Sequence, residues 1–441
     1  MNALIAIALL LTSATQFRLG GLPVGPGEIC LAIWIGLSLF RGAPPLSPAF
    51  ARMSLFWVLL TFAECIGTLN GYAMGDHHDT GLFLHDAMAF PFVGAVGCLL
   101  LTEPGAEVRL RRVAWTLLVL AAGSLTLQLG AAWDVLSLPF VEPWFGDRFR
   151  GWSNNSNQLA FFCAVLVLVG LHLADDAQRA RGRLGAVLCL TPIIIVGRLT
   201  KTDSFTFALL ASVPVFLVLK LRAWIVAPAS GPTPRPIIRI LAVLGLPLLI
   251  VSFGPLAVSA SGSPEQLVMG FMKGGGKEAA GETNLRLELW GEAIDRGLQA
   301  HMLGLGPGPH LPVPWSIVAV RTRESSPDVD PHPTLGDAPN FEAHNTFFDL
   351  FTQGGLIADV TLVWLIASAF LISYRAHAAG LSALVCGLLV FSLTNFTLRE
   401  PMFWFGMALA LVPFDTRRQR SPEREHGSDW NLAPVYRVRR G

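Results

Sequence analysis

Long apolar stretches dominate this chain and limit what it can fold into. A helix needs roughly 20 mostly apolar residues to cross the hydrocarbon core of a bilayer. About twelve stretches of the chain approach that length, at residues 2–17, 24–40, 53–70, 83–102, 112–132, 157–174, 184–197, 203–220, 237–259, 346–372, 380–397 and 400–414. The last two could instead form one re-entrant hairpin around residues 397–401. The stretches predict an all-α polytopic membrane protein with about twelve transmembrane helices.

The composition agrees with this fold class. Hydrophobic residues make up 52% of the chain and charged residues 14%, whereas soluble domains carry about 25% charged residues. These values exclude an ordinary soluble enzyme and a nucleic-acid-binding domain, so the lipid bilayer is the first expected partner. The six cysteines lie inside apolar stretches without a CxxC pair, and we expect buried thiols rather than disulfides or metal ligands.

The distribution of Lys and Arg predicts the orientation in the membrane. With a cytoplasmic N-terminus and twelve spans, the cytoplasmic side receives 20 of the 32 basic residues and the short outer loops receive 6. Short cytoplasmic loops carry the excess of positive charge, so both termini are expected in the cytoplasm. No basic residue precedes the first apolar run, which favours a retained first span over a cleaved signal peptide.

Four regions follow from this topology. Residues 1–259 hold transmembrane helices one to nine with short loops, and residues 260–345 form one large loop on the outer side. Residues 346–414 hold helices ten to twelve. Residues 415–441 form a basic tail that is expected to be cytoplasmic and disordered, as chain termini often are.

A few basic residues remain on the outer side, where topology does not require them. Most of them adjoin a span, and an Arg side chain suits phosphate and carboxylate groups through its fixed fork of donors. Taken singly, each could equally contact a lipid headgroup or a nearby carboxylate. Together they predict a site for a lipid-linked diphosphate, and they are Arg18, Arg148, Arg150, Arg198, Lys201, Arg286 and Arg399.

Five segments accompany these cations. Residues 147–160 carry four amides within five positions, which could cap a helix or face a polar cavity. Residues 197–204 form a hydroxyl-rich hairpin between two apolar helices. In the large loop, residues 284–294 begin an amphipathic helix and residues 304–309 form a glycine-rich turn. The loop closes on His344 and Asn345, directly before a span.

In this order the segments resemble the O-antigen ligase and polymerase family of inner-membrane glycosyltransferases. The family's Arg-x-x-Gly stretch and its Asn-x-Asn motif correspond to residues 148–157, with Asn-Ser-Asn in place of Asn-Pro-Asn. Its hydroxyl-rich hairpin corresponds to residues 200–204, where Arg198 or Lys201 would replace the family's Arg. Its Arg-x-x-Leu-Trp, Gly-x-Gly-x-Gly, His-Asn and paired-glycine motifs correspond to residues 286–290, 304–308, 344–345 and 354–355.

The resemblance implies an inverting, metal-independent transfer of a glycan from undecaprenyl diphosphate to an acceptor sugar, on the periplasmic side of a bacterial inner membrane and without a cofactor. His344 would be the general base, and Arg286 would stabilise the leaving diphosphate. The donor would be bound by Arg148, Arg150, Arg198, Lys201, Asn155, Asn157 and Asn345. A ligase would use lipid A–core as acceptor and a polymerase the growing glycan; the ligase is slightly favoured.

Two other classes of function are weighed against the transferase. A transporter of lipid-linked sugars would show paired repeats and polar groups near the membrane midplane, whereas the polar motifs here lie at the outer ends of spans. A structural or assembly protein would leave the ordered Arg, Asn and His motifs unexplained. Both alternatives therefore rank below the glycosyltransferase.

Several acidic and histidine residues are not assigned to the chemistry. Asp76-His77-His78-Asp79 is interpreted as a solvated turn between two spans, and the segment 328–332 as a flexible loop, rather than as metal sites. Glu64 and Asp359 lie within spans, where ionisable side chains usually face the protein interior. We assign neither of them to catalysis.

Overall fold

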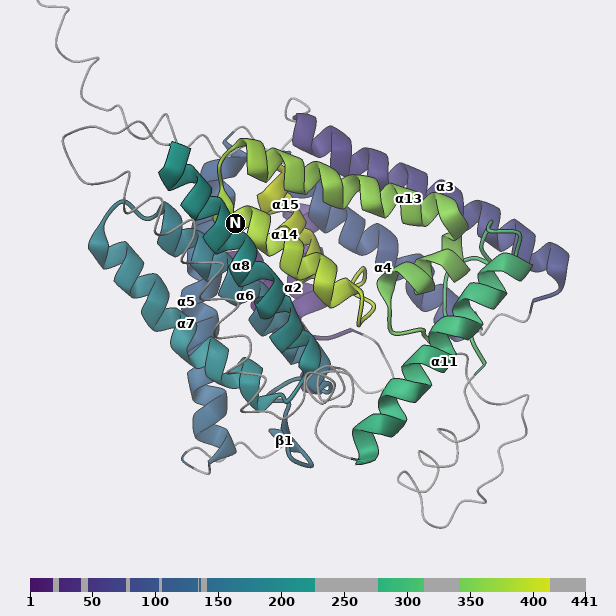
Figure 1. The fold of residues 1–441 in the computed structure, drawn as a ribbon, viewed down its shortest axis with the longest axis horizontal. Helices are drawn as coiled ribbons and strands as arrows, with labels where there is room; N and C mark the ends of the chain where they lie inside the picture. The colour runs from purple at the N-terminus through teal and green to yellow at the C-terminus, as the bar shows by residue number, and fades with distance from the viewer. Residues whose placement is uncertain are drawn as a thin grey trace, which may run out of the picture.

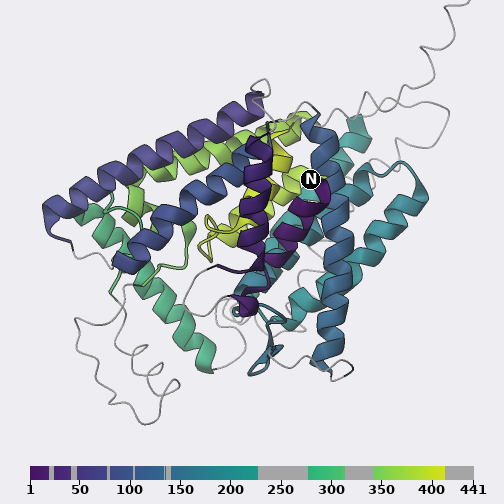
Figure 2. The same ribbon diagram turned by 180° about the vertical axis from the view of Figure 1, so that it is seen from behind.

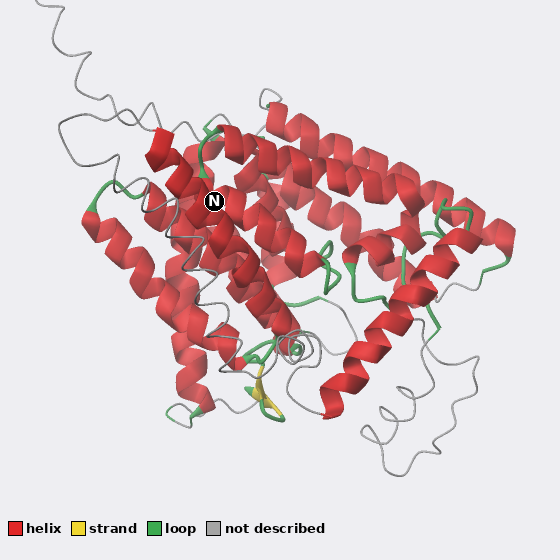
Figure 3. Cartoon of the chain, in the orientation of Figure 1, coloured by secondary structure: helices red, strands yellow, loops and turns green. Residues whose placement is uncertain are grey.

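The computed structural model describes residues 1–18, 24–40, 47–76, 80–102, 105–133, 135, 141–226, 277–312 and 341–412. Figure 1 and Figure 3 show that these residues form a bundle of α-helices with a small β-hairpin at its edge. The helices are α1 (Asn2–Leu11), α2 (Pro26–Leu39), α3 (Pro48–Met74), α4 (Thr80–Leu99), α5 (Ala106–Ala132), α6 (Ser156–Asp176), α7 (Ala180–Leu199), α8 (Asp203–Val226), α11 (Lys277–Gln299), α13 (Thr346–Arg375), α14 (Ala379–Ser392) and α15 (Pro401–Leu411). The short 3-10 helix η1 spans Thr15–Phe17, and the hairpin pairs β1 (Trp144–Phe145) with β2 (Arg148–Phe149).

The all-α, multi-pass membrane architecture is confirmed. In the part of the chain that the structure describes, seven helices are long and apolar enough to cross a membrane, namely α3, α4, α5, α6, α7, α8 and α13. The apolar helices α1, α2, α14 and α15 are shorter. Each predicted stretch coincides with one of these eleven helices except 237–259, which lies outside the described residues, as do the tail from residue 413 and much of the large loop.

The bundle is organised around α15. All residues of α15 are buried, and α4, α6, α13 and α14 pack against it. At 1.5 Å per residue this helix is roughly 16 Å long, and its full burial explains why it is apolar on every side. The outer helices α7 and α8 expose Leu184, Val187, Leu210 and Val218, as expected for side chains that face lipid. Figure 2 shows α1 and α2 on the other face of the bundle.

Hydrogen bonds join the loops at one end of the bundle, here called the His344 end. It comprises residues 12–18, 141–156, 300–312, 341–345 and 393–400. The side chain of Gln16 donates to the carbonyls of Glu142 and Gly151 at 2.9 and 3.0 Å. The hydroxyl of Thr346 donates to the carbonyl of Asn395 at 2.7 Å. Segments far apart in the sequence therefore form one surface.

Two predicted glycine motifs contact each other at this end. Gly355 breaks α13, with φ 65° and ψ −161°, and the amide of Leu356 donates to the carbonyl of Met302 at 2.9 Å. The amides of Leu305 and Gly306 donate to the carbonyl of Gln353 at 3.0 and 2.8 Å. The glycine-rich turn thus satisfies backbone groups that the break in α13 leaves without helical partners.

We expect Gly355→Ala to destabilise the protein. A Cβ at residue 355 would lie 2.1 Å from the carbonyl oxygen of Met302, on a backbone with positive φ. The strained φ alone costs about 1–3 kcal/mol, so the midpoint of thermal unfolding in detergent should fall by several degrees. Gly123→Ala in α5 is the matched control, because a Cβ there meets nothing within 4 Å. Equal midpoints for the two variants would contradict the prediction.

Candidate functional site

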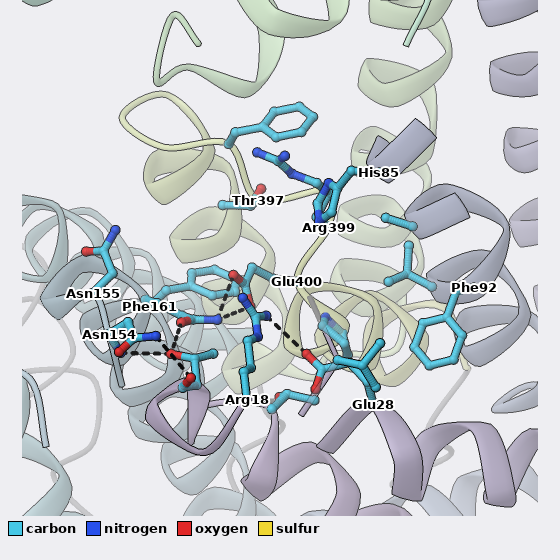
Figure 4. Close-up of a pocket in the computed structure, with 18 of the residues that line it drawn as sticks. Arg18, Glu28, His85, Phe92, Asn154, Asn155, Phe161, Thr397, Arg399 and Glu400 are labelled. Atoms are coloured by element: carbon cyan, nitrogen blue, oxygen red, sulfur yellow. Dashed lines mark hydrogen bonds and ion pairs between the residues drawn. The ribbon is translucent and has the colours of Figure 1, made fainter. Parts of the chain in front are cut away.

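A cavity of about 800 Å³ lies at the His344 end. Figure 4 shows it from within the bundle, with side chains contributed by η1, α2, α4, α6 and the segments that precede α13 and α15. Its apolar lining residues include Ile29, Ile33, Met88, Phe92 and Phe161, and its polar ones include Arg18, Glu28, Asn154, Asn155, Asn157, Gln158, Glu342, His344, Arg399 and Glu400. The cavity is therefore amphiphilic.

Among the described helices, four begin beside the cavity: α2, α6, α13 and α15. Their N-cap residues are Gly25, Asn155, Asn345 and Glu400. The side-chain oxygen of Asn155 accepts from the amide of Asn157 at 2.8 Å, and that of Asn345 accepts from the amide of Phe347 at 3.0 Å. Helix N-termini carry partial positive charge, and the carboxylates of Glu28, Glu342 and Glu400 line the same cavity, so its lining combines both signs of charge.

The four clustered amides all line the cavity, and they also hold η1 in place. The backbone and side-chain nitrogens of Asn154 donate to the hydroxyl and carbonyl of Thr15 at 2.8 and 3.0 Å. Gln158 accepts from the hydroxyl of Ser153 at 3.1 Å and donates to Glu400 at 3.2 Å. The two interpretations of this motif, helix capping and a polar cavity, therefore both apply, the first to Asn155 and the second to the whole group.

Arg148 connects two of the predicted motifs. Its guanidinium donates to the side-chain oxygen of Asn157 at 2.9 Å, to the hydroxyl of Thr202 at 3.2 Å and to the carbonyl of Thr200 at 3.2 Å. The Arg-x-x-Gly stretch and the hydroxyl-rich hairpin are thus neighbours. Arg148 lies behind Asn157, which itself lines the cavity, so Arg148 orients an amide of the wall.

Three other predicted cations contact partners away from the cavity. Arg150 pairs with Glu142 at 2.6 Å, and Arg198 donates to the hydroxyl of Thr206 at 2.6 Å. Lys201 pairs with Asp147 at 2.5 Å, and this hydrogen bond lowers the pKa of the exposed Asp147 carboxyl. None of the three cations lines the cavity.

His344 lines the cavity on a strained backbone. Its φ is 53°, a conformation that costs non-glycine residues energy and recurs at functional sites. The carboxylate of Asp349 accepts from the backbone amides of the two residues that flank His344, Ala343 at 2.7 Å and Asn345 at 3.2 Å. The ring of Phe341 packs edge-on against the imidazole, with centroids 5.0 Å apart. The backbone on both sides of His344 is thus held by Asp349, and its imidazole packs against Phe341.

Helix α11 brings Arg286 toward this segment. The indole of Trp290 donates to the carbonyl of Ala343 at 3.1 Å and packs against Phe348. Arg286 lies one turn before Trp290, and residues four apart share a helix face. Arg286 is half-buried and makes no hydrogen bond or ion pair within the described residues. It does not line the cavity, although the sequence predicted it as a catalytic residue.

The sequence interpretation missed the network around Arg399. The Arg399 guanidinium pairs with Asp86 of α4 at 3.0 Å and with Glu342, and His85 contacts Asp86 at 2.9 Å. Burial opposes the charge on Arg399, but Glu342 and Asp86 outweigh it and raise the pKa of the guanidinium. Figure 4 shows Arg399 and the Arg18–Glu28 ion pair, 3.1 Å long, among the side chains of the cavity. The sequence offered only one signal for Arg399, namely its position outside a predicted span. Its partners Asp86 and Glu342 lie in other segments, so the sequence did not indicate the ion pairs.

Glu400 gives the cavity a pH-dependent contribution to stability. Burial raises its pKa above the usual 4.5, against the opposing hydrogen bond from Gln158. A carboxyl with a raised pKa in the folded state binds its proton more tightly there, so its stabilisation is full below the unfolded pKa and is lost as pH rises through the folded pKa.

We therefore expect Glu400→Gln to resemble the parent protein in thermal stability at pH 4 and to exceed it increasingly as pH rises toward 7. Thermal unfolding across that range measures the difference. A Glu400→Gln difference that is constant with pH would contradict the prediction.

The remaining acidic residues lie away from the cavity. Glu64 is buried in α3 next to Gly354, and Asp359 is half-buried in α13. Asp76 pairs with Arg296, and His310 contacts its carboxylate at 3.1 Å. Within the described residues, no group of three or more His, Cys, Asp or Glu side chains is placed to hold a metal ion. Residues 77–79 and 328–332 lie outside that part of the chain.

The chain matches no protein-family model, and no curated protein matches it. Its function is therefore argued from the cavity and the residues around it.

Proposed function

We propose that this chain is an inverting, metal-independent glycosyltransferase of the O-antigen ligase type. It would move a glycan from undecaprenyl diphosphate to an acceptor sugar of lipid A–core, at the periplasmic face of a bacterial inner membrane. The observation that carries this proposal is the cavity that His344 lines together with apolar side chains and with Arg18 and Arg399. A polyprenyl diphosphate likewise combines an apolar chain with an anionic head.

The apolar wall supports entry of the donor from the bilayer. Ile29 and Ile33 of α2 and Met88 of α4 line the cavity and are 44%, 51% and 57% exposed. The polyprenyl chain would lie between these two helices. The diphosphate would then meet the N-termini of α2, α6, α13 and α15, which favour anions without a metal.

The residues around the cavity supply the groups that the transfer needs. His344 takes the proton of the acceptor hydroxyl, whose oxygen attacks the anomeric carbon. The bond between that carbon and the diphosphate oxygen breaks, and its electron pair leaves with the diphosphate. Arg18 and Arg399 line the cavity and would stabilise the departing charge. A single displacement of this kind inverts the anomeric configuration.

Deletion of the gene and complementation with the intact chain tests the proposal, with surface polysaccharide analysed by gel. For a ligase, the deletion leaves lipid A–core without long glycan while lipid-linked polymer accumulates. Core that carries single repeat units would instead indicate the polymerase. Accumulation of unpolymerised lipid-linked repeat units would favour the transporter, and unaltered polysaccharide would overturn the glycosyltransferase proposal.

A further inference from the structure

Helix α11 has three distinct faces. Leu289, Ala293 and the backbone at Gly297 pack toward α13. A second face carries the acidic residues Glu288, Glu292 and Asp295. The third face is apolar and exposed, with Leu287 at 50%, Ile294 at 40% and Leu298 at 48% exposure. At about 100° per residue, positions i, i+7 and i+11 fall on one narrow stripe of a helix.

The helix runs across the ends of the bundle. In Figure 1, α7 and α14 descend from left to right, whereas α11 rises from left to right and crosses their direction. Its contact with the segment before α13, through Trp290 and Ala343, places α11 at the His344 end. A helix in this position lies near the boundary between lipid and water.

The apolar stripe of α11 continues into a surface that faces lipid. Met302 follows α11 and is exposed, and its carbonyl accepts from the amide of Leu356 at 2.9 Å. Leu356 begins a row of exposed apolar side chains on the spanning helix α13, which continues through Val360 and Val363. Lipid that covers this row on α13 would therefore meet the stripe of α11 without a polar break.

We propose that α11 is an interfacial helix whose stripe, Leu287, Ile294, Leu298 and Met302, is embedded in the lipid leaflet at the His344 end. Amphipathic helices lie in the plane of a membrane with their apolar face at the headgroup and acyl boundary, and here the acidic face would remain in water. A second copy of the chain fits less well, because a stable interface buries about 1,000 Å² or more, far beyond four side chains. The inference does not depend on the glycosyltransferase proposal.

The contact with lipid has a consequence for the cavity. The same helix holds the backbone of Ala343 through Trp290, and Ala343 precedes His344. The leaflet would thus fix the distance of α11 from the membrane surface. Because α11 holds Ala343, it would also fix the distance of the His344 segment from that surface.

Spin-label accessibility in the full chain tests this inference. A variant without its six native cysteines is reconstituted in vesicles of phosphatidylcholine and phosphatidylglycerol, with single labels at Ile294→Cys and Leu298→Cys. Labels at Glu288→Cys and Asp295→Cys, on the acidic face of the same helix, are the matched controls. Oxygen concentrates in the bilayer and a nickel chelate in water, so the ratio of oxygen to nickel accessibility should be severalfold higher at the two stripe positions.

Equal nickel accessibility at all four positions would show that the stripe faces water and would overturn the inference. Low accessibility to both reagents at the stripe would show that protein covers it, with the same consequence. Should the cysteine-free variant fail to fold, a photo-crosslinking amino acid is placed at Leu298 or Asp295 in the native-cysteine chain. Crosslinks to phospholipid from position 298 and not from 295 support the inference, and the reverse pattern overturns it.

Discussion

His344→Asn is expected to reduce glycan transfer by about 10²–10⁴-fold, the contribution typical of a positioned general base. Asparagine cannot take the proton of the acceptor hydroxyl, but it tolerates positive φ better than most residues. The substitution should therefore keep the backbone of residue 344, where φ is 53°, and leave the thermal unfolding midpoint near that of the parent. The purified protein, supplied with an undecaprenyl-diphosphate-linked glycan and an acceptor, provides the measurement.

His301→Asn is the matched control for this substitution. His301 also has a positive φ, 56°, and lies at the same end of the bundle, but it does not line the cavity. Transfer by this variant should match the parent. Should His344→Asn transfer glycan at the parental rate while folding normally, His344 is not the base. A matched loss in both variants would instead attribute the effect to the backbone.

The helices could be predicted from the sequence because apolar stretches are local signals. Two long-range relations also followed from the expected topology. Helices that alternate in direction bring residues 148–157 and 200–204 to one end, where Arg148 contacts Thr202. The same alternation brings His344 and Asn155 to one end of the bundle, where both residues line the cavity.

The pairing of side chains could not be predicted in this way. The predicted topology places Arg150, Lys201 and Arg399 on the same side of the membrane and does not distinguish them. In the structure, Arg150 and Lys201 pair with the exposed carboxylates of Glu142 and Asp147. Arg399 instead pairs with Asp86 and Glu342, from two other segments. Which cation reaches a cavity depends on these long-range partners, and hydropathy carries no information about them.

Arg399→Met is expected to cost about 3 kcal/mol of stability at pH 7, because it leaves two carboxylates without their cation. The Asp86 side chain is 1% exposed and that of Glu342 is 23% exposed, so water can compensate little of the loss at Asp86. Unfolding of the purified protein by heat or by denaturing detergent measures the change. Arg198→Met is the control, because Arg198 is exposed and donates to the neutral hydroxyl of Thr206. The stability of this variant should equal that of the parent within experimental error.

Asp86→Asn distinguishes charge from packing at Arg399. In the Arg399→Met background, this second substitution removes a buried negative charge that has lost its Arg399 partner and keeps only its contact with His85, so it should recover part of the lost stability. In the parent background, the same substitution removes a partner of Arg399 and should be destabilising. A change of sign between the two backgrounds is the signature of direct coupling. Purely additive effects would show that the ion pair with Asp86 does not contribute to the effect of Arg399, which would leave its pair with Glu342 and its contact with the ring of Phe396.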